Sequence, residues 1–206
     1  MDFIDGIEPR DDGEVVASPE TAAPHLIVIG NGMAGCRAVE ELIARDSGRY
    51  RVTIFGAEPH VNYNRIMLSP VLAGEKAFDD IVINDRAWYA DNNIDLVVND
   101  PVVAIDRAAK TVTARSGRVA HYDKLLIATG SDPFIIPVPG KNLPGVVSFR
   151  DMSDVDRMLA AAESGGDAVV IGGGAARAGG CAWFVAARDE GHRHSPDADI
   201  DGTPAR

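Results

Sequence analysis

The stretch that decides the fold is HLIVIGNGMAGCRAVEELIARD, residues 25–46. It begins as a continuous apolar run, typical of a strand buried on both faces, and continues into Gly30, Gly32 and Gly35 at the GxGxxG spacing. Apolar residues at helical spacing follow, and RVTIFG, residues 51–56, has the pattern of a second strand. The sequence therefore predicts a βαβ unit with a glycine-rich turn between its first strand and its helix.

The three glycines have separate physical roles in such a loop. Gly30 permits the tight turn, Gly32 lets the backbone approach a pyrophosphate, and Gly35 lets the helix pack closely on the strand. The anion lies on the helix N-terminus, so Met33 and Ala34, which complete the loop, belong to the predicted cofactor site.

A carboxylate follows the second strand at the offset that dinucleotide sites require. Glu58 ends TIFGAE, residues 53–58, and is predicted to bind a ribose hydroxyl. The glycine spacing alone is weak evidence, and a tight β-to-α turn without a ligand is the alternative interpretation. The strand, the helix and the acid together favour the nucleotide site.

The pattern beyond this unit predicts a small antiparallel excursion that returns to the main sheet. Short strands are expected at residues 95–98, 102–107, 111–115 and 122–130. A connector rich in proline and glycine then leads to a helix that begins near residue 151, with Asp151 or Ser153 as its cap.

The composition limits the classes of function. The chain has 206 residues, 46% hydrophobic and 25% charged, as in soluble globular proteins, and its net charge of −11 argues against a nucleic-acid partner. Cys36 and Cys181 form no CxxC pair, so no metal site is predicted. The acidic N-terminus and the lack of an apolar run of about 18 residues predict a cytoplasmic protein without a membrane span.

Two further stretches, NYNRIMLSP at residues 62–70 and YDKLLIATGSDPFIIPVPG at residues 122–140, carry a resemblance. With the glycine loop, they make the chain resemble the flavoprotein reductases that contain two dinucleotide domains, most of all the N-terminal part of NAD(P)H-dependent nitrite reductase large subunits. The resemblance implies an α/β fold: a Rossmann-like, three-layer FAD-binding sheet with a small antiparallel excursion, followed by an incomplete second dinucleotide-binding unit.

This fold divides the chain into four regions. Residues 1–24 are rich in Asp, Glu, Pro and Ala and are predicted to be a disordered acidic tail. Residues 25–140 form the first segment of the FAD-binding domain. Residues 141–174 are the connector and the start of the NAD(P)H-binding domain, and residues 175–206 are predicted to be a disordered tail that is translated out of frame.

The resemblance assigns several side chains to the flavin. In that family a Y-x-R-x-x-L-S loop lies against the cofactor, which implies contacts for Tyr63, Arg65, Leu68 and Ser69. Arg65 would place a cation near anionic groups of the cofactor. Related ferredoxin and rubredoxin reductases have a lysine after the serine, where this chain has Pro70. That departure favours the nitrite reductase branch.

Two more matches concern the backbone. The family's A-T-G turn matches Ala128, Thr129 and Gly130, where the chain would pass close to the FAD, and the VVAID strand would place the backbone of Val102 near the adenine. Each piece alone is also typical of ordinary α/β proteins, in which an apolar strand ends in a turn. Their joint order and spacing support the FAD interpretation.

The resemblance implies hydride transfer from NAD(P)H to FAD, with electrons passed towards nitrite by siroheme and an iron–sulfur cluster that this chain does not carry. It also implies a small subunit as a partner in the full-length family. We expect the chain to lack segments needed for catalysis, so it is predicted to hold no catalytic residue. A ferredoxin- or rubredoxin-type reductase fragment and a non-catalytic nucleotide-binding fragment remain alternative interpretations.

The second glycine loop departs from the pattern. VVIGGG supplies Gly172 and Gly174, which are assigned to the NAD(P)H site, but Arg177 stands where the third glycine belongs. Gly179 and Gly180 interrupt the helix that should follow, and no β-branched run comes after it to form the next strand. As written, this βαβ unit cannot close.

A change of reading frame at or just before Ala175 explains the departure. AARAGGC, residues 175–181, written as GCT GCT CGG GCT GGA GGC TGC, gives LLGLEA one base later, a helix of the resembled family. The same shift lets residues 189–205 encode MKVTVIHLMPTLMERQL, a strand followed by a loop. We expect the coding DNA, sequenced through Gly174 and read one base later, to give this helix and strand. Any other reading there would contradict the frameshift.

Overall fold

The computed structural model of the chain describes residues 23–165 and 167–171. These fall in two compact units, one running up to Arg65 and resuming over Asp79–Asp132, the other made of Ile66–Phe78 and the chain from Pro133 onward. Outside the described residues lie all but the end of the predicted acidic tail, Gly172 and Gly174, and the predicted out-of-frame tail.

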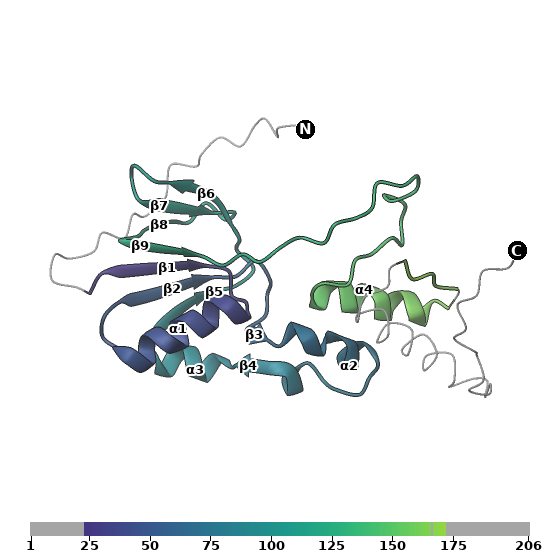
Figure 1. Cartoon of the computed structure of the whole chain (residues 1–206), viewed down its shortest axis with the longest axis horizontal. Coiled ribbons are helices and arrows are strands. Elements are labelled where there is room, and N and C mark those ends of the chain that lie inside the picture. The colour runs from purple at the N-terminus through teal and green to yellow at the C-terminus, as the bar shows by residue number, and fades with distance from the viewer. Residues whose placement is uncertain (1–22, 166, 172–206) are drawn as a thin grey trace, which may run out of the picture. The chain divides into compact units, whose positions relative to one another are not determined.

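The first unit is built on a parallel sheet, as the sequence predicted. Its four strands are β1 (His25–Ile29), β2 (Arg51–Phe55), β5 (Ile94–Val97) and β9 (Lys124–Ile127), in the order β5-β2-β1-β9 (Figure 1). Each neighbouring pair is parallel. Since β1 lies between β2 and β9, the carboxyl ends of all three strands meet at one edge of the sheet.

Two helices cover one face of this sheet, α1 (Met33–Arg45) and α3 (Arg86–Asp91) (Figure 1). Alternate residues of the strands point to them, because side chains of a strand alternate between its faces. The core on this side consists of Val28, Cys36, Val39, Val52, Ile54, Tyr89 and Ile94.

The other face carries the antiparallel excursion, which the structure confirms. It is a three-stranded sheet of β6 (Val102–Asp106), β7 (Thr111–Ala114) and β8 (Val119–His121). Helices, parallel sheet and antiparallel sheet thus form three layers (Figure 1). The second core, between the two sheets, consists of Ile27, Ile29, Phe55, Val112, Ala114 and Tyr122.

Short elements occupy the loop between β2 and α3. Strands β3 (Asn62–Tyr63) and β4 (Val82–Asn84) pair antiparallel in a two-stranded sheet of the first unit. Two turns of 3₁₀ helix, Arg65–Met67 and Asp79–Ile81, stand in the sequence at the two ends of the segment that belongs to the second unit. This loop carries the Y-x-R stretch singled out in the sequence.

The second unit packs α2 (Leu68–Leu72) against α4 (Met152–Glu163). Of the two caps considered for α4, Asp151 is the one used: its side chain accepts a hydrogen bond from the amide of Asp154. Extended backbone at Asp151 and a side-chain oxygen three residues before a free helix amide are what an N-cap requires. No helix among the residues described is long and apolar enough to cross a membrane.

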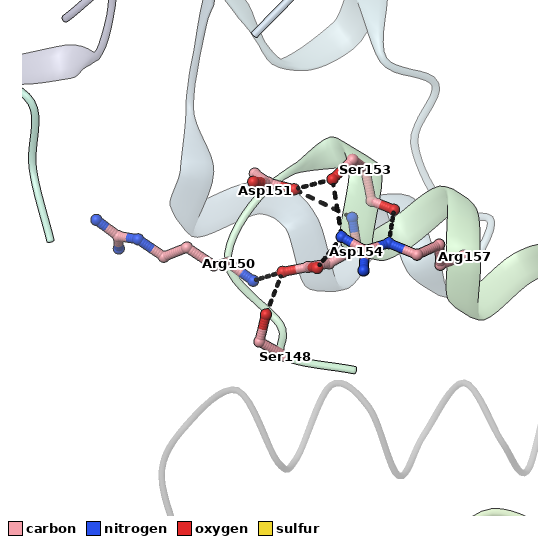
Figure 2. A network of polar contacts seen from close by, with 6 residues as sticks. All are labelled: Ser148, Arg150, Asp151, Ser153, Asp154 and Arg157. Atoms are coloured by element: carbon pink, nitrogen blue, oxygen red, sulfur yellow. Dashed lines mark hydrogen bonds and ion pairs between the residues drawn. The ribbon is translucent and has the colours of Figure 1, made fainter. Parts of the chain in front are cut away.

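Asp154 organises the start of α4 (Figure 2). Its buried carboxylate accepts hydrogen bonds from the hydroxyl of Ser148, at 2.9 Å, and from the amide of Arg150, at 2.8 Å. The guanidinium of Arg157 lies 3.0 Å away and balances the charge. A buried carboxylate needs such partners, so Asp154 fixes the chain that enters α4 to the helix itself.

One predicted element is wrong in this structure. Residues 167–171, predicted to open the second βαβ unit as a buried strand, belong to no strand, and Val169 and Ile171 are 86% and 75% exposed. A strand exists only through hydrogen bonds to a neighbouring strand. The helix and strand that would complete the unit fall beyond residue 171, outside the described residues.

A buried histidine ties three strands together at the start of β1. The amide of His25 donates to the carboxylate of Asp123 at 2.6 Å, its Nδ1 lies 2.7 Å from the carbonyl of His121, and its Nε2 lies 2.8 Å from the hydroxyl of Thr53. A carbonyl only accepts, so Nδ1 carries the proton and Nε2 accepts from Thr53. Burial and the charge of Arg51 lower the pKa of His25.

This shift predicts a loss of stability in mild acid. In the unfolded chain His25 has its ordinary pKa of 6.5, so below that pH the unfolded state binds the proton more readily than the folded state. The contribution of neutral His25 to the free energy of unfolding is complete above its ordinary pKa. It is lost as the pH falls through the lowered pKa of the folded state. The free energy of unfolding, measured with urea from about pH 8 to about pH 5, should fall more steeply with pH for the wild type than for His25→Gln. An identical pH dependence of the two proteins would contradict this account.

Candidate functional site

The turn after β1 admits no side chain at its first glycine. Gly30 has a φ of +113°, and a Cβ built there would lie 2.2 Å from the carbonyl oxygen of Ala128. Hydrogen bonds fix the backbone on both sides: the Gly30 amide donates to Phe55 at 2.8 Å, and the Ala128 amide donates to Ile29 at 2.8 Å. Both the dihedral angle and the space therefore require glycine.

The other two glycines differ from each other. A Cβ at Gly35 would lie 2.6 Å from the carbonyl oxygen of Gly30, so the helix rests directly on the loop. A Cβ at Gly32 would meet nothing within 4 Å. Packing explains Gly35 but not Gly32, and the open space in front of Gly32 is where a ligand can approach the backbone.

The N-terminus of α1 is suited to an anion. Gly32 is its N-cap and has no side chain to bind the first amides, and the first turn contains no acidic residue. The amides of Met33 and Ala34 are among those that find no partner within a helix, and the helix dipole adds a partial positive charge there. The predicted loop residues thus combine free backbone donors with open space at Gly32, as an anion site requires.

Glu58 follows β2, beside this loop, and is held by two neighbours. The hydroxyl of Tyr63 donates to its carboxylate at 2.6 Å, and Arg65 forms an ion pair with the other carboxylate oxygen. The guanidinium of Arg65 also lies 5.4 Å from the centre of the Tyr63 ring. Tyr63 is buried, whereas the side chains of Glu58 and Arg65 remain about a quarter exposed. The carboxylate is therefore fixed in orientation and partly accessible to solvent.

The remaining predicted residues of the first unit lie along the same edge of the sheet. Thr129 and Gly130 continue the chain from β9 past Ala128, and Gly130 has a φ of +78°. Val102 begins β6 and is partly buried against the inter-sheet core. The amide of Asn99, on the turn before it, donates to the carbonyl of Glu58 at 2.9 Å.

Two predicted residues belong to the second unit. Leu68 is buried in α2, and the carbonyl of Ser69 accepts the amide of Ala73 at the end of that helix. Their predicted contacts with a flavin stay predictions.

A polar cluster that sequence patterns do not indicate lies beneath the loop. The side-chain oxygen of Asn31, between the first two glycines, accepts from the hydroxyl of Tyr89 at 2.7 Å and from the thiol of Cys36 at 3.2 Å. Burial raises the pKa of Cys36 to about 11, and burial together with Cys36 raises the pKa of Tyr89. Both groups therefore stay protonated donors at neutral pH. The middle position of GxG accepts any residue, so spacing could not identify Asn31.

Comparison with known proteins agrees with this geometry. The sequence profile of the pyridine nucleotide-disulphide oxidoreductase family matches residues 24–185. The chain belongs to this family. The match includes the glycine loop, Glu58, the Y-x-R stretch and the turn after β9.

Individual relatives point in the same direction. Nitrite reductase [NAD(P)H] of Bacillus subtilis is 51% identical over 146 residues, which is 71% of this chain and 18% of that protein. Rhodocoxin reductase of Rhodococcus erythropolis is 34% identical over 148 residues, 71% of this chain and 34% of that protein. The crystal structure of NADH:rubredoxin oxidoreductase from Clostridium acetobutylicum superposes with a TM-score of 0.71 at 28% identity, covering 80% of this chain and 42% of that one. The chain thus spans less than half the length of these relatives.

The loop geometry predicts a large loss of stability for one glycine substitution and a small change for another. Gly30→Ala should lower the free energy of unfolding by about 3 kcal/mol or more, since it combines a disallowed φ with a clash against fixed backbone. Gly32→Ala, which meets open space, should change it by less than about 1 kcal/mol. Urea unfolding of both variants provides the measurement. Equal losses would show that the loop does not have this geometry.

Proposed function

We propose that the first unit binds the adenosine and pyrophosphate part of FAD. The observation that carries the proposal is that a single sheet edge brings together the anion-suited N-terminus of α1, the open space at Gly32 and the fixed carboxylate of Glu58. Phosphates and ribose hydroxyls are the two groups that such an arrangement recognises. The family to which the chain belongs supports a dinucleotide as the ligand.

Different residues would bind different parts of the cofactor. The amides of Gly32, Met33 and Ala34 would donate to the pyrophosphate, and Glu58 would accept from the ribose hydroxyls. Tyr63, which already donates to Glu58, would act as a positioning residue rather than offer its buried ring to the flavin.

The backbone would supply the rest of the site. The turn at Ala128, Thr129 and Gly130 would line the cofactor's path, and the backbone of Val102 would lie near the adenine. Arg65 would contribute positive charge beside the pyrophosphate while keeping its contact with Glu58. Bound FAD supplies the redox chemistry that connects a pyridine nucleotide with other electron carriers.

We propose that the parent protein is an NAD(P)H-dependent nitrite reductase. The 51% identity to the Bacillus subtilis enzyme and Pro70, in place of the lysine of ferredoxin-type reductases, support this branch. In that protein Gly172 and Gly174 would begin the NAD(P)H site, siroheme and an iron–sulfur cluster would act beyond this chain, and a small subunit would be a partner. The cytoplasmic location expected from the sequence stays a prediction.

A reductase of ferredoxin or rubredoxin is the second candidate. The rhodocoxin reductase and the NADH:rubredoxin oxidoreductase cover similar shares of the chain, at 34% and 28% identity. Expression of the protein with the reading frame corrected at residue 175 separates the two. NADH oxidation that depends on nitrite supports the first candidate, whereas reduction of ferredoxin or rubredoxin without nitrite turnover supports the second.

Flavin binding tests the proposed site directly. Titration of FAD with the chain should quench flavin fluorescence, and Glu58→Gln should weaken the affinity about ten- to hundredfold, since a hydrogen bond to a charged acceptor contributes about 1.5–3 kcal/mol. Glu41→Gln makes the same charge change at an exposed position of α1 and should bind like the wild type. A wild-type chain that binds no FAD, or equal weakening in both variants, would refute the proposed site.

A further inference from the structure

We propose that Asn31 is a positioning residue for the dinucleotide, which holds the glycine loop in its binding geometry from beneath and ties it to the loop that carries Glu58. The inference rests on the proposed FAD site. It adds a residue that lies inside the glycine motif but acts away from the ligand.

The side chain of Asn31 is hydrogen-bonded to other parts of the protein at both of its polar atoms. Its Oδ1 accepts from the hydroxyl of Tyr89 and the thiol of Cys36, which uses both lone pairs of the oxygen. Its Nδ2 donates to the carbonyl of His60 at 3.2 Å. The side chain of Asn31 therefore fixes the backbone between Gly30 and Gly32 without using that backbone's own amides.

The three partners come from three different segments. Cys36 lies in the first turns of α1, Tyr89 in α3, and His60 in the loop after β2, two residues beyond Glu58. Asn31 therefore connects the turn proposed to bind phosphate with the segment proposed to bind ribose. A displacement of one would be transmitted to the other through the partly buried hydrogen bond from Asn31 to His60.

Tyr89 anchors this connection. It is 3% exposed, its ring packs edge-on against Trp88 at 5.0 Å between ring centres, and its hydroxyl accepts from the amide of Asn62 at 3.3 Å. With its donor proton directed to Asn31 at 2.7 Å, the hydroxyl has a fixed role on both sides. A buried donor of this kind favours the observed orientation of the loop, because the alternative acceptor on this side, Sγ of Cys36 at 3.5 Å, is a weak one.

The backbone directly after β2, at Gly56, also leaves room for Asn31. A Cβ at Gly56 would lie 3.0 Å from the Cβ of Asn31 and 3.7 Å from the carbonyl oxygen of Val97. The Gly56 amide donates to that same carbonyl at 2.7 Å, so this backbone has little freedom to withdraw. Gly56→Ala therefore pushes on Asn31 while every hydrogen-bonding group of the cluster remains present.

A neighbouring amide pair offers a matched control. Asn62 donates to Asn84 at 2.7 Å, and Asn84 donates to Glu40 at 2.8 Å. Asn84 is as buried as Tyr89 and lies in the same unit, but its side chain bonds to Asn62 and Glu40 rather than to the glycine loop. Asn84→Ala should lower stability much as Asn31→Ala does and leave the loop in place.

The experiment measures two properties of the 206-residue chain. Every protein carries Cys181→Ser, so that Cys36 is the single remaining cysteine. The variants are Asn31→Ala, Tyr89→Phe, Gly56→Ala, the pair Asn31→Ala with Tyr89→Phe, and Asn84→Ala. FAD affinity is read from fluorescence quenching. Reaction of Cys36 with a thiol reagent, without flavin, reports how often the loop opens.

Each of the first three variants should weaken FAD binding about five- to tenfold, because Asn31→Ala and Tyr89→Phe remove hydrogen bonds of the cluster and Gly56→Ala displaces Asn31. The pair should lose no more than the weaker-binding single variant, because both changes remove the same interaction. Cys36 should react about tenfold faster in these proteins than in the wild type, and Asn84→Ala should match the wild type in affinity and reactivity.

Other outcomes overturn the inference. Unchanged FAD affinity in Asn31→Ala, or equal weakening in Asn84→Ala, would reduce the cluster to a structural role. A wild type that binds no FAD would refute the proposed function instead. The rate at which Cys36 reacts with the thiol reagent, measured without flavin, then still decides whether Asn31 holds the loop. A rate in Asn31→Ala equal to that of the wild type would show that it does not.

Discussion

Everything at this sheet edge depends on the close approach of two backbones. The carbonyl of Ala128 occupies the volume that a side chain at Gly30 would need, 2.2 Å from where its Cβ would lie. Because hydrogen bonds also hold both backbone segments in the parallel sheet, neither segment can move away from the other. This constraint sets the direction in which the chain leaves β1, and hence the place where α1 begins. A helix that begins there presents its free amides next to the end of β2, where Glu58 stands.

The site is thus assembled by the sheet rather than by any one loop. Parallel pairing of β1 with β2 and β9 brings three strand ends to one edge, although they come from distant parts of the sequence. Hydrogen bonds continue the ladder past the strands, from Gly30 to Phe55 and from Gly56 to Val97. Side chains then fix what the ladder leaves free: Tyr63 and Arg65 hold Glu58, and Asn31 contacts the segment that follows it.

The sequence alone was sufficient for features that follow from local patterns. The apolar run of β1, the glycine spacing and the offset of Glu58 have fixed periods, so the βαβ unit could be predicted. Contacts between segments could not: no spacing shows that Tyr63 donates to Glu58 or that Tyr89 reaches Asn31. The choice of Asp151 over Ser153 as a cap depends on backbone geometry. The run at residues 167–171 shows the opposite limit, since strand-forming residues form no strand without a partner.

The central position of β1 has a consequence for the order of events during synthesis. His25 and Asp123, which meet at the start of β1, are 98 residues apart in the chain. At roughly 5–20 residues per second, β9 leaves the ribosome on the order of 5–20 s after its partner. During that interval one edge of β1 has no neighbour, and Gly30 has no Ala128 against which to turn. Parallel pairing between such distant segments is slow in any case. Until β9 is made, the nascent βαβ unit therefore exposes the unpaired edge of β1, and such apolar strand edges favour aggregation.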